Sequence, residues 1–207
     1  MRVLLDDEPI TPEPVTVADA IEAARARAEH DDRLIIEVEA DGGPIADELL
    51  NEPPSDDAGI SELRLVSTDR VKFIRVTIGD AVEAVDHAVE RQAVAAELIE
   101  SGDVASANQP LSEALTTWQA LHDVVDQAAR LMGVDPGAIE VEPSEGSSGA
   151  TTGSACIANL LGALEEIKRS VTERDTAGLA DTLREDMDSV ARDWRSLLDA
   201  LSARAGV

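Results

Sequence analysis

Aromatic side chains are almost absent from this chain of 207 residues, which contains one Phe, two Trp and no Tyr. The hydrophobic content of 43% is nevertheless ordinary for a globular protein. The core must therefore be built from aliphatic side chains, and the abundant alanine favours helix. Trp118 and Trp194 stand out as the two bulkiest side chains available for a core or an interface.

Cysteine and long apolar runs are equally scarce. Cys156 is the single cysteine, so no internal disulfide can form and a reducing compartment is compatible with the sequence. No stretch approaches the roughly 20 apolar residues that cross a bilayer. The apolar run Val3–Leu5 near the N-terminus is far too short for a signal peptide. We therefore expect a cytoplasmic protein that does not bind or span a membrane.

Positive charge is the third deficit, because 17 basic residues face 43 acidic ones and the formal net charge is -26. Nucleic-acid binding needs a basic surface that releases counterions, so this composition argues against it. A basic protein partner would instead be attracted, and more weakly as salt rises. Lys72 and Lys168 are the only lysines, whereas Arg is common. This bias fits a bacterial host with a GC-rich genome or a salty cytoplasm.

The first third of the sequence predicts a small α+β domain, residues 1–67. Patterns of apolar and β-branched residues predict strands at 2–5, 34–39 and 63–66, with a short partner strand at 44–45. A returning strand at 10–15 is interrupted by prolines and must be irregular or at an edge. Thr16 is the expected N-cap of a helix over 17–29, whose apolar residues recur at helical spacing.

This order of elements resembles the β-grasp (ubiquitin-like) fold over about residues 1–66. Sulfur carriers and modifiers of that family end in an exposed Gly-Gly. Here the Gly42-Gly43 pair lies in an expected internal turn and the chain continues. The resemblance therefore implies the fold without the carrier chemistry.

Residues 68–204 follow a helical period. Apolar stripes predict helices over about 71–99, 104–132, 156–171 and 179–201. Gly102-Asp103 and Asp175 mark tight turns, which makes neighbouring helices antiparallel. Pro110 requires the second helix either to begin near Gln109 or to kink. Residues 135–154 are rich in Gly, Ser, Thr and Pro, and we expect them to form a disordered linker between two helical hairpins.

The predicted fold is thus an N-terminal α+β, β-grasp-like domain followed by an all-α up-down four-helix bundle. A long helix, the Gly102-Asp103 turn, a second long helix and a hairpin turning at Glu173-Arg174-Asp175 together resemble the flagellin-export chaperone bundle. In that family a helical bundle binds the disordered terminal segment of a secreted subunit along hydrophobic grooves. The resemblance implies a chaperone of the same kind.

Trp118 and Trp194 are the leading candidates for a partner-binding site. A half-exposed Trp anchors interfaces, whereas a buried one needs a partner for its N–H group, so both a groove and a core position are open. Leu115 and Val190 lie one turn before each Trp on the same apolar stripes. We predict that these four residues contribute to a binding groove.

Catalytic chemistry has no recognisable motif in this sequence. His87 and His122, with Asp86, Glu90 and Asp126, have the residue types of a metal site, but the Glu-x-x-His spacing of di-iron bundles is missing. Cys156 begins a predicted helix, where a thiol can become reactive, yet it has no neighbouring base in the sequence. The glycines of 146–153 lack the lysine of a phosphate loop. We predict no catalytic residue, no metal and no cofactor.

The sequence therefore favours a non-enzymatic adaptor or chaperone that binds a basic or amphipathic segment of a protein partner in a groove of the bundle. A homodimeric scaffold that uses the first long helix as its interface is the alternative. A metal- or thiol-dependent enzyme is the third possibility.

Overall fold

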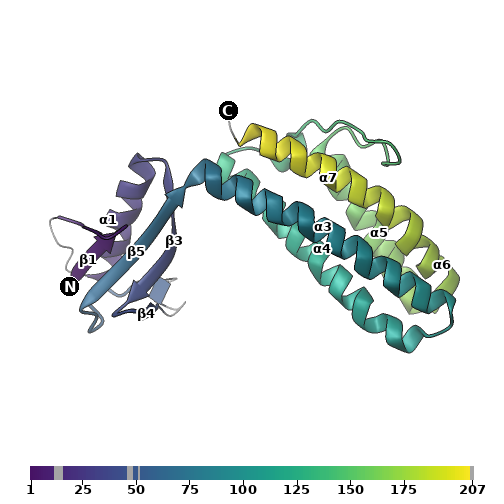
Figure 1. Ribbon diagram of the computed structural model, residues 1–207, viewed down its shortest axis with the longest axis horizontal. Coiled ribbons are helices and arrows are strands. Elements are labelled where there is room, and N and C mark those ends of the chain that lie inside the picture. Colours follow the sequence, from purple (N-terminus) through teal and green to yellow (C-terminus); the bar gives the residue numbers. More distant parts are fainter. Residues whose placement is uncertain (12–15, 46–48, 51, 206–207) are drawn as a thin grey trace. The chain divides into compact units, whose positions relative to one another are not determined.

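The computed structural model describes residues 1–11, 16–45, 49–50 and 52–205. The chain divides into two compact units, Met1–Phe73 and Ile74–Val207. The first unit contains a mixed β-sheet with a helix packed on it, and the second is helical (Figure 1). The α+β composition that we predicted is therefore present. Each unit has its own apolar core, and the two are described separately below.

The sheet of the first unit has five strands in the order β2-β1-β5-β3-β4. β1 and β5 are parallel, and the other neighbouring pairs are antiparallel. A β-bulge lies in β3 between Ile35 and Glu37. The strands are β1 (Arg2–Leu5), β2 (Glu8–Pro9), β3 (Arg33–Ala40), β4 (Gly43–Pro44) and β5 (Glu62–Asp69).

Helix α1 (Val17–His30) packs its apolar side against this sheet. The Thr16 hydroxyl accepts a hydrogen bond from the Asp19 N–H at 3.0 Å, which confirms the predicted N-cap. The expected returning strand begins earlier than residue 10, because β2 pairs with β1 through Glu8 and Pro9. Residues 12–15 of that expected strand lie outside the described residues. The core of the unit contains Val3, Leu5, Val17, Ala20, Ile21, Ala24, Leu63 and Leu65.

β5 is longer than predicted and leads directly into α3 (Arg70–Glu100). Its last residues stay in the sheet because Ser67 donates its N–H and hydroxyl to the Asp6 carboxylate at 2.7 and 2.6 Å. The Asp69 carboxylate then accepts the Lys72 N–H at 2.7 Å and caps the helix. The strand therefore continues past Ser67, the end of the domain that we predicted.

The second unit consists of α3 and four further α-helices, with a π-helical turn η2 (Thr182–Asp186) between two of them. α4 begins after Asp103, whose carboxylate accepts the Ser106 N–H, and ends at Gly133 in the left-handed conformation (φ 68°). Asp175 likewise caps α6 through the Gly178 N–H at 2.9 Å. The further helices are α4 (Val104–Met132), α5 (Gly153–Glu173), α6 (Thr176–Asp181) and α7 (Met187–Arg204).

Pro110 lies inside α4, because this helix begins at Val104 and not near Gln109. The Asp103 cap and the burial of Pro110, Leu111 and Ala107 hold the first turns in place. The fourth predicted helix is also not one regular helix, because η2 separates α6 from α7. A π-helical turn shifts the register of the residues that follow it, which changes the face that they present.

The structure places residues 135–152 against the helical unit and begins α5 at Gly153, whereas we predicted a disordered linker over residues 135–154. The segment forms the 3-10 turn η1 (Pro136–Ala138), capped by Asp135, and a β-bridge between Glu140 and Thr152. Three of its apolar residues, Ile139, Val141 and Ala150, are buried in the core of the helical unit. The composition of this segment is typical of disorder, but burial of these three apolar residues packs it against the helices. We call residues 135–152 the strap.

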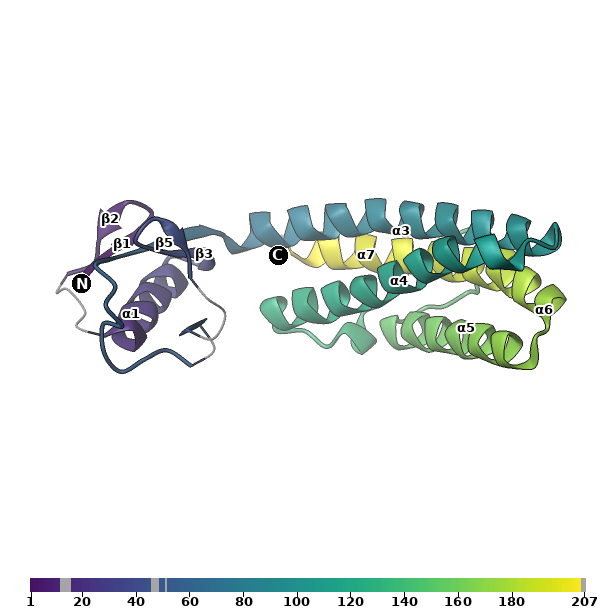
Figure 2. The ribbon, with the colours of Figure 1, turned by 90° about the horizontal axis from the view of Figure 1, so that it is seen from below.

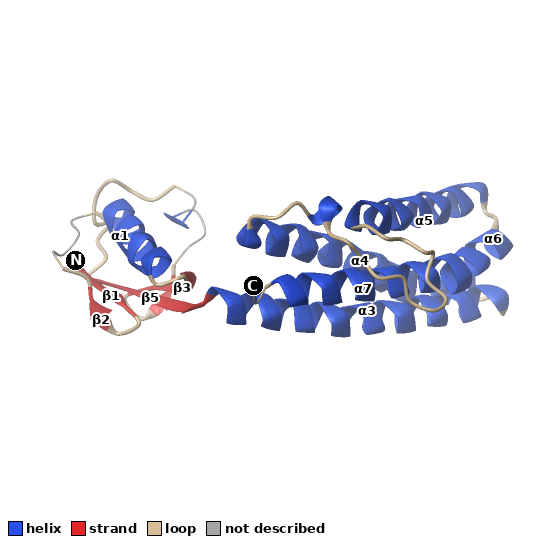
Figure 3. Cartoon of the chain, turned by 90° about the horizontal axis from the view of Figure 1, so that it is seen from above, coloured by secondary structure: helices blue, strands red, loops and turns tan. Residues whose placement is uncertain are grey.

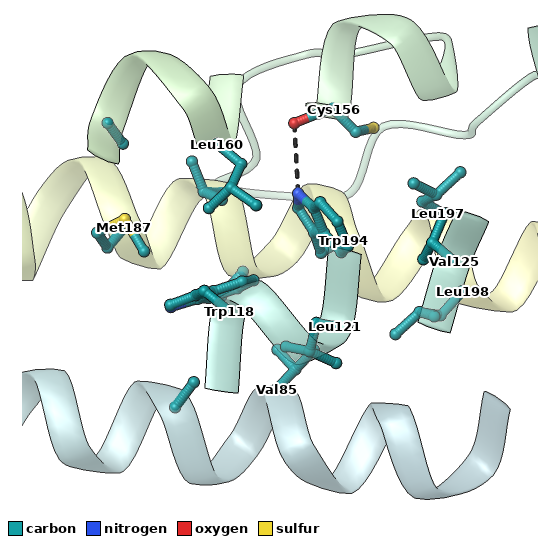
Figure 4. Close-up of a cluster of buried hydrophobic side chains, with 14 of the residues drawn as sticks. Val85, Trp118, Leu121, Val125, Cys156, Leu160, Met187, Trp194, Leu197 and Leu198 are labelled. Carbon is teal, nitrogen blue, oxygen red and sulfur yellow. Dashed lines mark hydrogen bonds between the residues drawn. The ribbon is translucent and has the colours of Figure 1, made fainter. Parts of the chain in front are cut away.

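Trp118 of α4 and Trp194 of α7 are both fully buried at the centre of this core. Their ring centroids lie 5.9 Å apart with planes at 77°, an edge-to-face contact that aromatic pairs favour. Figure 4 shows Leu160, Met187 and Leu121 around the two rings. Within the residues that the structure describes, no helix is both long and apolar enough to cross a membrane.

Candidate functional site

A groove of about 750 Å³ lies between α4 and α5. The two helices run antiparallel and stand side by side in both turned views (Figures 2 and 3). Along α4 the groove extends from Asn108 to Asp123, which is about 22 Å at the rise of an α-helix. We call it the α4–α5 groove. Of the described hollows in the helical unit, it has the largest apolar surface.

Leucine, isoleucine, valine and tryptophan side chains form the floor and walls of the groove. Trp118, Leu160 and Ile167 are buried beneath it, while Leu115 and Leu164 are half-buried on its walls. Leu161 and Val171 of α5 are each 52% exposed at its edge. Large exposed apolar side chains are uncommon in this chain, so two beside one apolar groove mark a contiguous uncovered surface.

The rim of the groove is polar and nearly uncharged. Asn108, Ser112 and Gln119 lie along α4, and Thr172 lies on α5. Asp123 and Lys168 are the charged residues of the lining, and the His122 imidazole lies 3.9 Å from the Asp123 carboxylate. A polar rim around an apolar centre is the usual anatomy of a protein-binding surface.

The four residues that we predicted for a binding groove separate into two groups. Leu115 and Trp118 line the α4–α5 groove. Trp194 lies behind Trp118 in the core, and Val190 lines a different, smaller hollow of about 340 Å³ beside α5. Sequence reasoning missed Leu161 and Lys168. The adjacent pair Leu160-Leu161 gave only a weak signal, because neighbouring residues on a helix can share one core, as Leu197 and Leu198 of α7 do.

Each indole N–H of the buried pair has a hydrogen-bond acceptor. Trp118 Nε1 donates to Gln92 Oε1 at 3.2 Å, and Trp194 Nε1 donates to the Cys156 carbonyl oxygen at 3.3 Å (Figure 4). Gln92 is itself almost fully buried on α3. Both tryptophans are therefore satisfied core residues, and only Trp118 also borders the groove.

The Cys156 thiol is buried at the first turns of α5. Burial, followed by the nearby negative charge of Asp193, raises the pKa of this thiol to about 11. The thiolate is the reactive form of cysteine, so this environment opposes nucleophilic chemistry. The helix N-terminus, which we considered as an activating feature, is outweighed by desolvation.

We therefore expect Cys156 to be unreactive in the folded protein. At pH 8 only about one thiol in a thousand is ionised when its pKa is about 11. A chromogenic disulfide reagent should label the native chain very slowly and the urea-unfolded chain at once. Stoichiometric labelling of the native chain within seconds would contradict the buried position of this side chain.

The structure does not assemble the residues that we considered for a metal site. Asp86 accepts two hydrogen bonds from Arg195, and Asp126 pairs with Arg130 at 2.7 Å. His122 instead faces the Trp194 ring, with centroids 6.4 Å apart. Across residues 1–11, 16–45, 49–50 and 52–205, no three His, Cys, Asp or Glu side chains are grouped to hold a metal ion.

Polar contacts around the buried Asp193 attach the strap to α7. The Ser148 hydroxyl donates to Asp193 Oδ2 at 2.5 Å, and Asn159 Nδ2 lies 2.7 Å from the same hydroxyl oxygen. Arg192 donates to the Glu145 carbonyl oxygen at 3.0 Å, which adds a second attachment. Asp193 is almost fully buried, and its Oδ2 accepts hydrogen bonds from Ser148 and Asn159, whereas its buried Oδ1 has no hydrogen-bond partner in the described part of the chain.

No protein-family model, characterised protein or solved structure matches this chain in sequence or in fold.

Proposed function

We propose that this protein is a non-enzymatic adaptor or chaperone whose α4–α5 groove binds an amphipathic helical segment of a partner protein. The observation that carries the proposal is the pair of exposed side chains, Leu161 and Val171, beside an apolar groove with a polar rim. A helix laid in such a groove would cover this apolar surface with its own apolar face.

The architecture supports the same proposal. The strand order β2-β1-β5-β3-β4, with β1 and β5 parallel, is consistent with a β-grasp domain. The antiparallel α4 and α5, together with α3 and α7, are consistent with an up-down four-helix bundle. The Gly42-Gly43 pair lies where β3 turns into β4, which gives no support to carrier chemistry.

The length of the groove suits a helix. A segment of about 15 residues would match the 22 Å from Asn108 to Asp123. Its apolar residues, spaced three and four apart, would contact Leu115, Leu161 and Leu164. An extended peptide would leave backbone N–H and C=O groups over apolar side chains, which costs free energy, whereas a helix satisfies these groups internally.

Charge favours a different protein over a second copy of this chain. The net charge of -26 makes two copies repel each other, and it attracts a partner that is basic overall. In a symmetric dimer two identical grooves would face each other, and two concave surfaces are not complementary in shape. The homodimeric scaffold remains an outcome that the experiment below would detect.

Binding of a neutral amphipathic helix tests this proposal. The probe is a fluorescent 16-residue peptide with a leucine stripe and otherwise alanine and glutamine, measured by anisotropy with the intact chain. We expect Leu161→Glu to weaken binding about tenfold, because it removes an apolar contact worth about 1.4 kcal/mol from the edge of the groove.

Val76→Glu is the matched control, because Val76 is similarly exposed at 54% but lies on α3, outside the groove lining. It should leave the affinity unchanged. Equal losses in the two variants, or the absence of any binding, would refute the α4–α5 groove as the site. Light scattering that shows a dimer sensitive to Leu161→Glu would assign the groove to a second copy instead.

A further inference from the structure

Two rim charges of the α4–α5 groove lack an ionic partner of opposite sign. Lys168 has no carboxylate within 4.0 Å in the described part of the chain, although acidic residues greatly outnumber basic ones. Asp123 has only the imidazole of its neighbour His122, at 3.9 Å. In the described part of the helical unit, Arg75, Arg174 and Arg204 also have no carboxylate partner, but none of them lines the groove. The guanidinium groups that do pair with carboxylates are those of Arg91, Arg130, Arg169, Arg184, Arg192 and Arg195.

These two charges lie towards opposite ends of the groove. Asp123 is in the later half of α4, and Lys168 is in the later half of α5. Because α4 and α5 are antiparallel, the later half of one helix lies beside the earlier half of the other (Figure 3). Lys168 is therefore near the Asn108 and Ser112 end, away from Asp123.

In the described part of the chain, no carboxylate of α5 pairs with Lys168. Glu166 and Glu173 both pair with Arg169, the residue next to it. Glu165, three residues before Lys168 on the same face of α5, does not pair with it within 4.0 Å either, and the Lys168 side chain lines the groove. A lone ammonium group beside an apolar surface is a recognition element for a carboxylate, because the pair becomes less screened once a ligand excludes water.

We infer that the partner helix carries a carboxylate in register with Lys168 and a cation in register with Asp123, roughly two to three turns apart. This inference rests on the proposed function, because it needs a helix in the groove. The partner segment would therefore carry one charge of each sign and would not be uniformly basic, although the acidic chain as a whole attracts basic proteins. The charges would select among amphipathic helices that share the same apolar face.

Two peptides that differ in one charged residue provide the test. Both carry the same leucine stripe. The mixed peptide has Glu at one end and Arg at the other, and the basic peptide has Arg at both ends. A helix can enter the groove in either direction, so the mixed peptide can always place its charges correctly. Affinities are measured by fluorescence anisotropy at 0.15 M salt with the intact chain.

We expect Lys168→Glu to weaken binding of the mixed peptide about three- to tenfold and to strengthen binding of the basic peptide. Arg204→Glu is the matched control, because it changes the net charge equally at an exposed residue of α7 outside the groove lining. It should leave the affinity for the mixed peptide unchanged.

The outcomes separate the two proposals. If the wild-type chain binds the mixed peptide and Lys168→Glu has the same effect as Arg204→Glu, the charge inference fails while the groove remains the binding site. If neither peptide binds the wild-type chain, the proposed function and the charge inference both fail.

Discussion

Replacing Trp194 by alanine should lower the free energy of unfolding of the helical unit by about 3–5 kcal/mol, the usual cost of truncating a buried Trp. The side chain is fully buried, contacts the Trp118 ring edge-to-face and belongs to the same core cluster as Leu160, Met187 and Leu197. Truncation leaves a cavity in an aliphatic core that has few other large side chains to fill it. The Cys156 carbonyl oxygen also loses its hydrogen-bond donor.

Urea unfolding followed by far-ultraviolet circular dichroism measures this change. Trp194→Phe should cost much less, because it keeps most of the apolar volume and loses mainly the N–H donor. A loss below about 1 kcal/mol for Trp194→Ala would mean that this residue is not in the core. The sequence is compatible with either a core or a groove position for each tryptophan, and this experiment distinguishes the two positions for Trp194.

Replacing Gly153 by alanine should destabilise the helical unit by about 2–3 kcal/mol, although alanine is ordinarily the better helix former. Gly153 is the first residue of α5. A Cβ atom there would lie 1.9 Å from the Pro136 carbonyl oxygen and 3.3 Å from Leu197 Cδ1. The closest clash is with backbone, so no side-chain rotation relieves it, and the strap must move away from α5.

Gly162→Ala is the control, because Gly162 is also in α5 but has open space around its Cβ position. That substitution should stabilise the chain by about 0.5–1 kcal/mol. If Gly153→Ala is stabilising to the same degree, residues 135–152 do not pack against the start of α5, and the original prediction of a disordered linker is restored.

The helix ends of this chain could be predicted from the sequence where a capping residue is present. Thr16, Asp103 and Asp175 each accept the N–H three residues ahead of them, as expected of N-caps. Gly133 ends α4 in the left-handed conformation that favours glycine. These features involve residues close together in the chain, so the sequence contains all the information that they need.

The strap could not be predicted in this way. Its composition is that of a flexible segment, and its order depends on contacts with residues far along the chain, such as Ser148 with Asp193. The register change at η2 is similar, because the apolar stripe continues through it without a visible break. Tertiary contacts override local composition at both places.

The α4–α5 groove shows the same limit. The apolar stripes of α4 and α5 indicated which residues face inward, and Leu115 and Trp118 were among those that we selected. The stripes did not indicate that α4 and α5 leave an apolar surface uncovered between them. Leu161 and Lys168 acquire their importance only from the position of that surface.

A methyl-detected NMR titration of the intact chain with the neutral amphipathic peptide tests the central proposal most directly. If the groove binds the helix, the methyl signals of Leu115, Leu161, Leu164 and Val171 will shift together and saturate at one peptide concentration. The signals of Val76 and Ile36, which are equally accessible but outside the groove, will stay in place. Shifts centred on Val76 or Ile36, with the groove methyl signals unchanged, would contradict it.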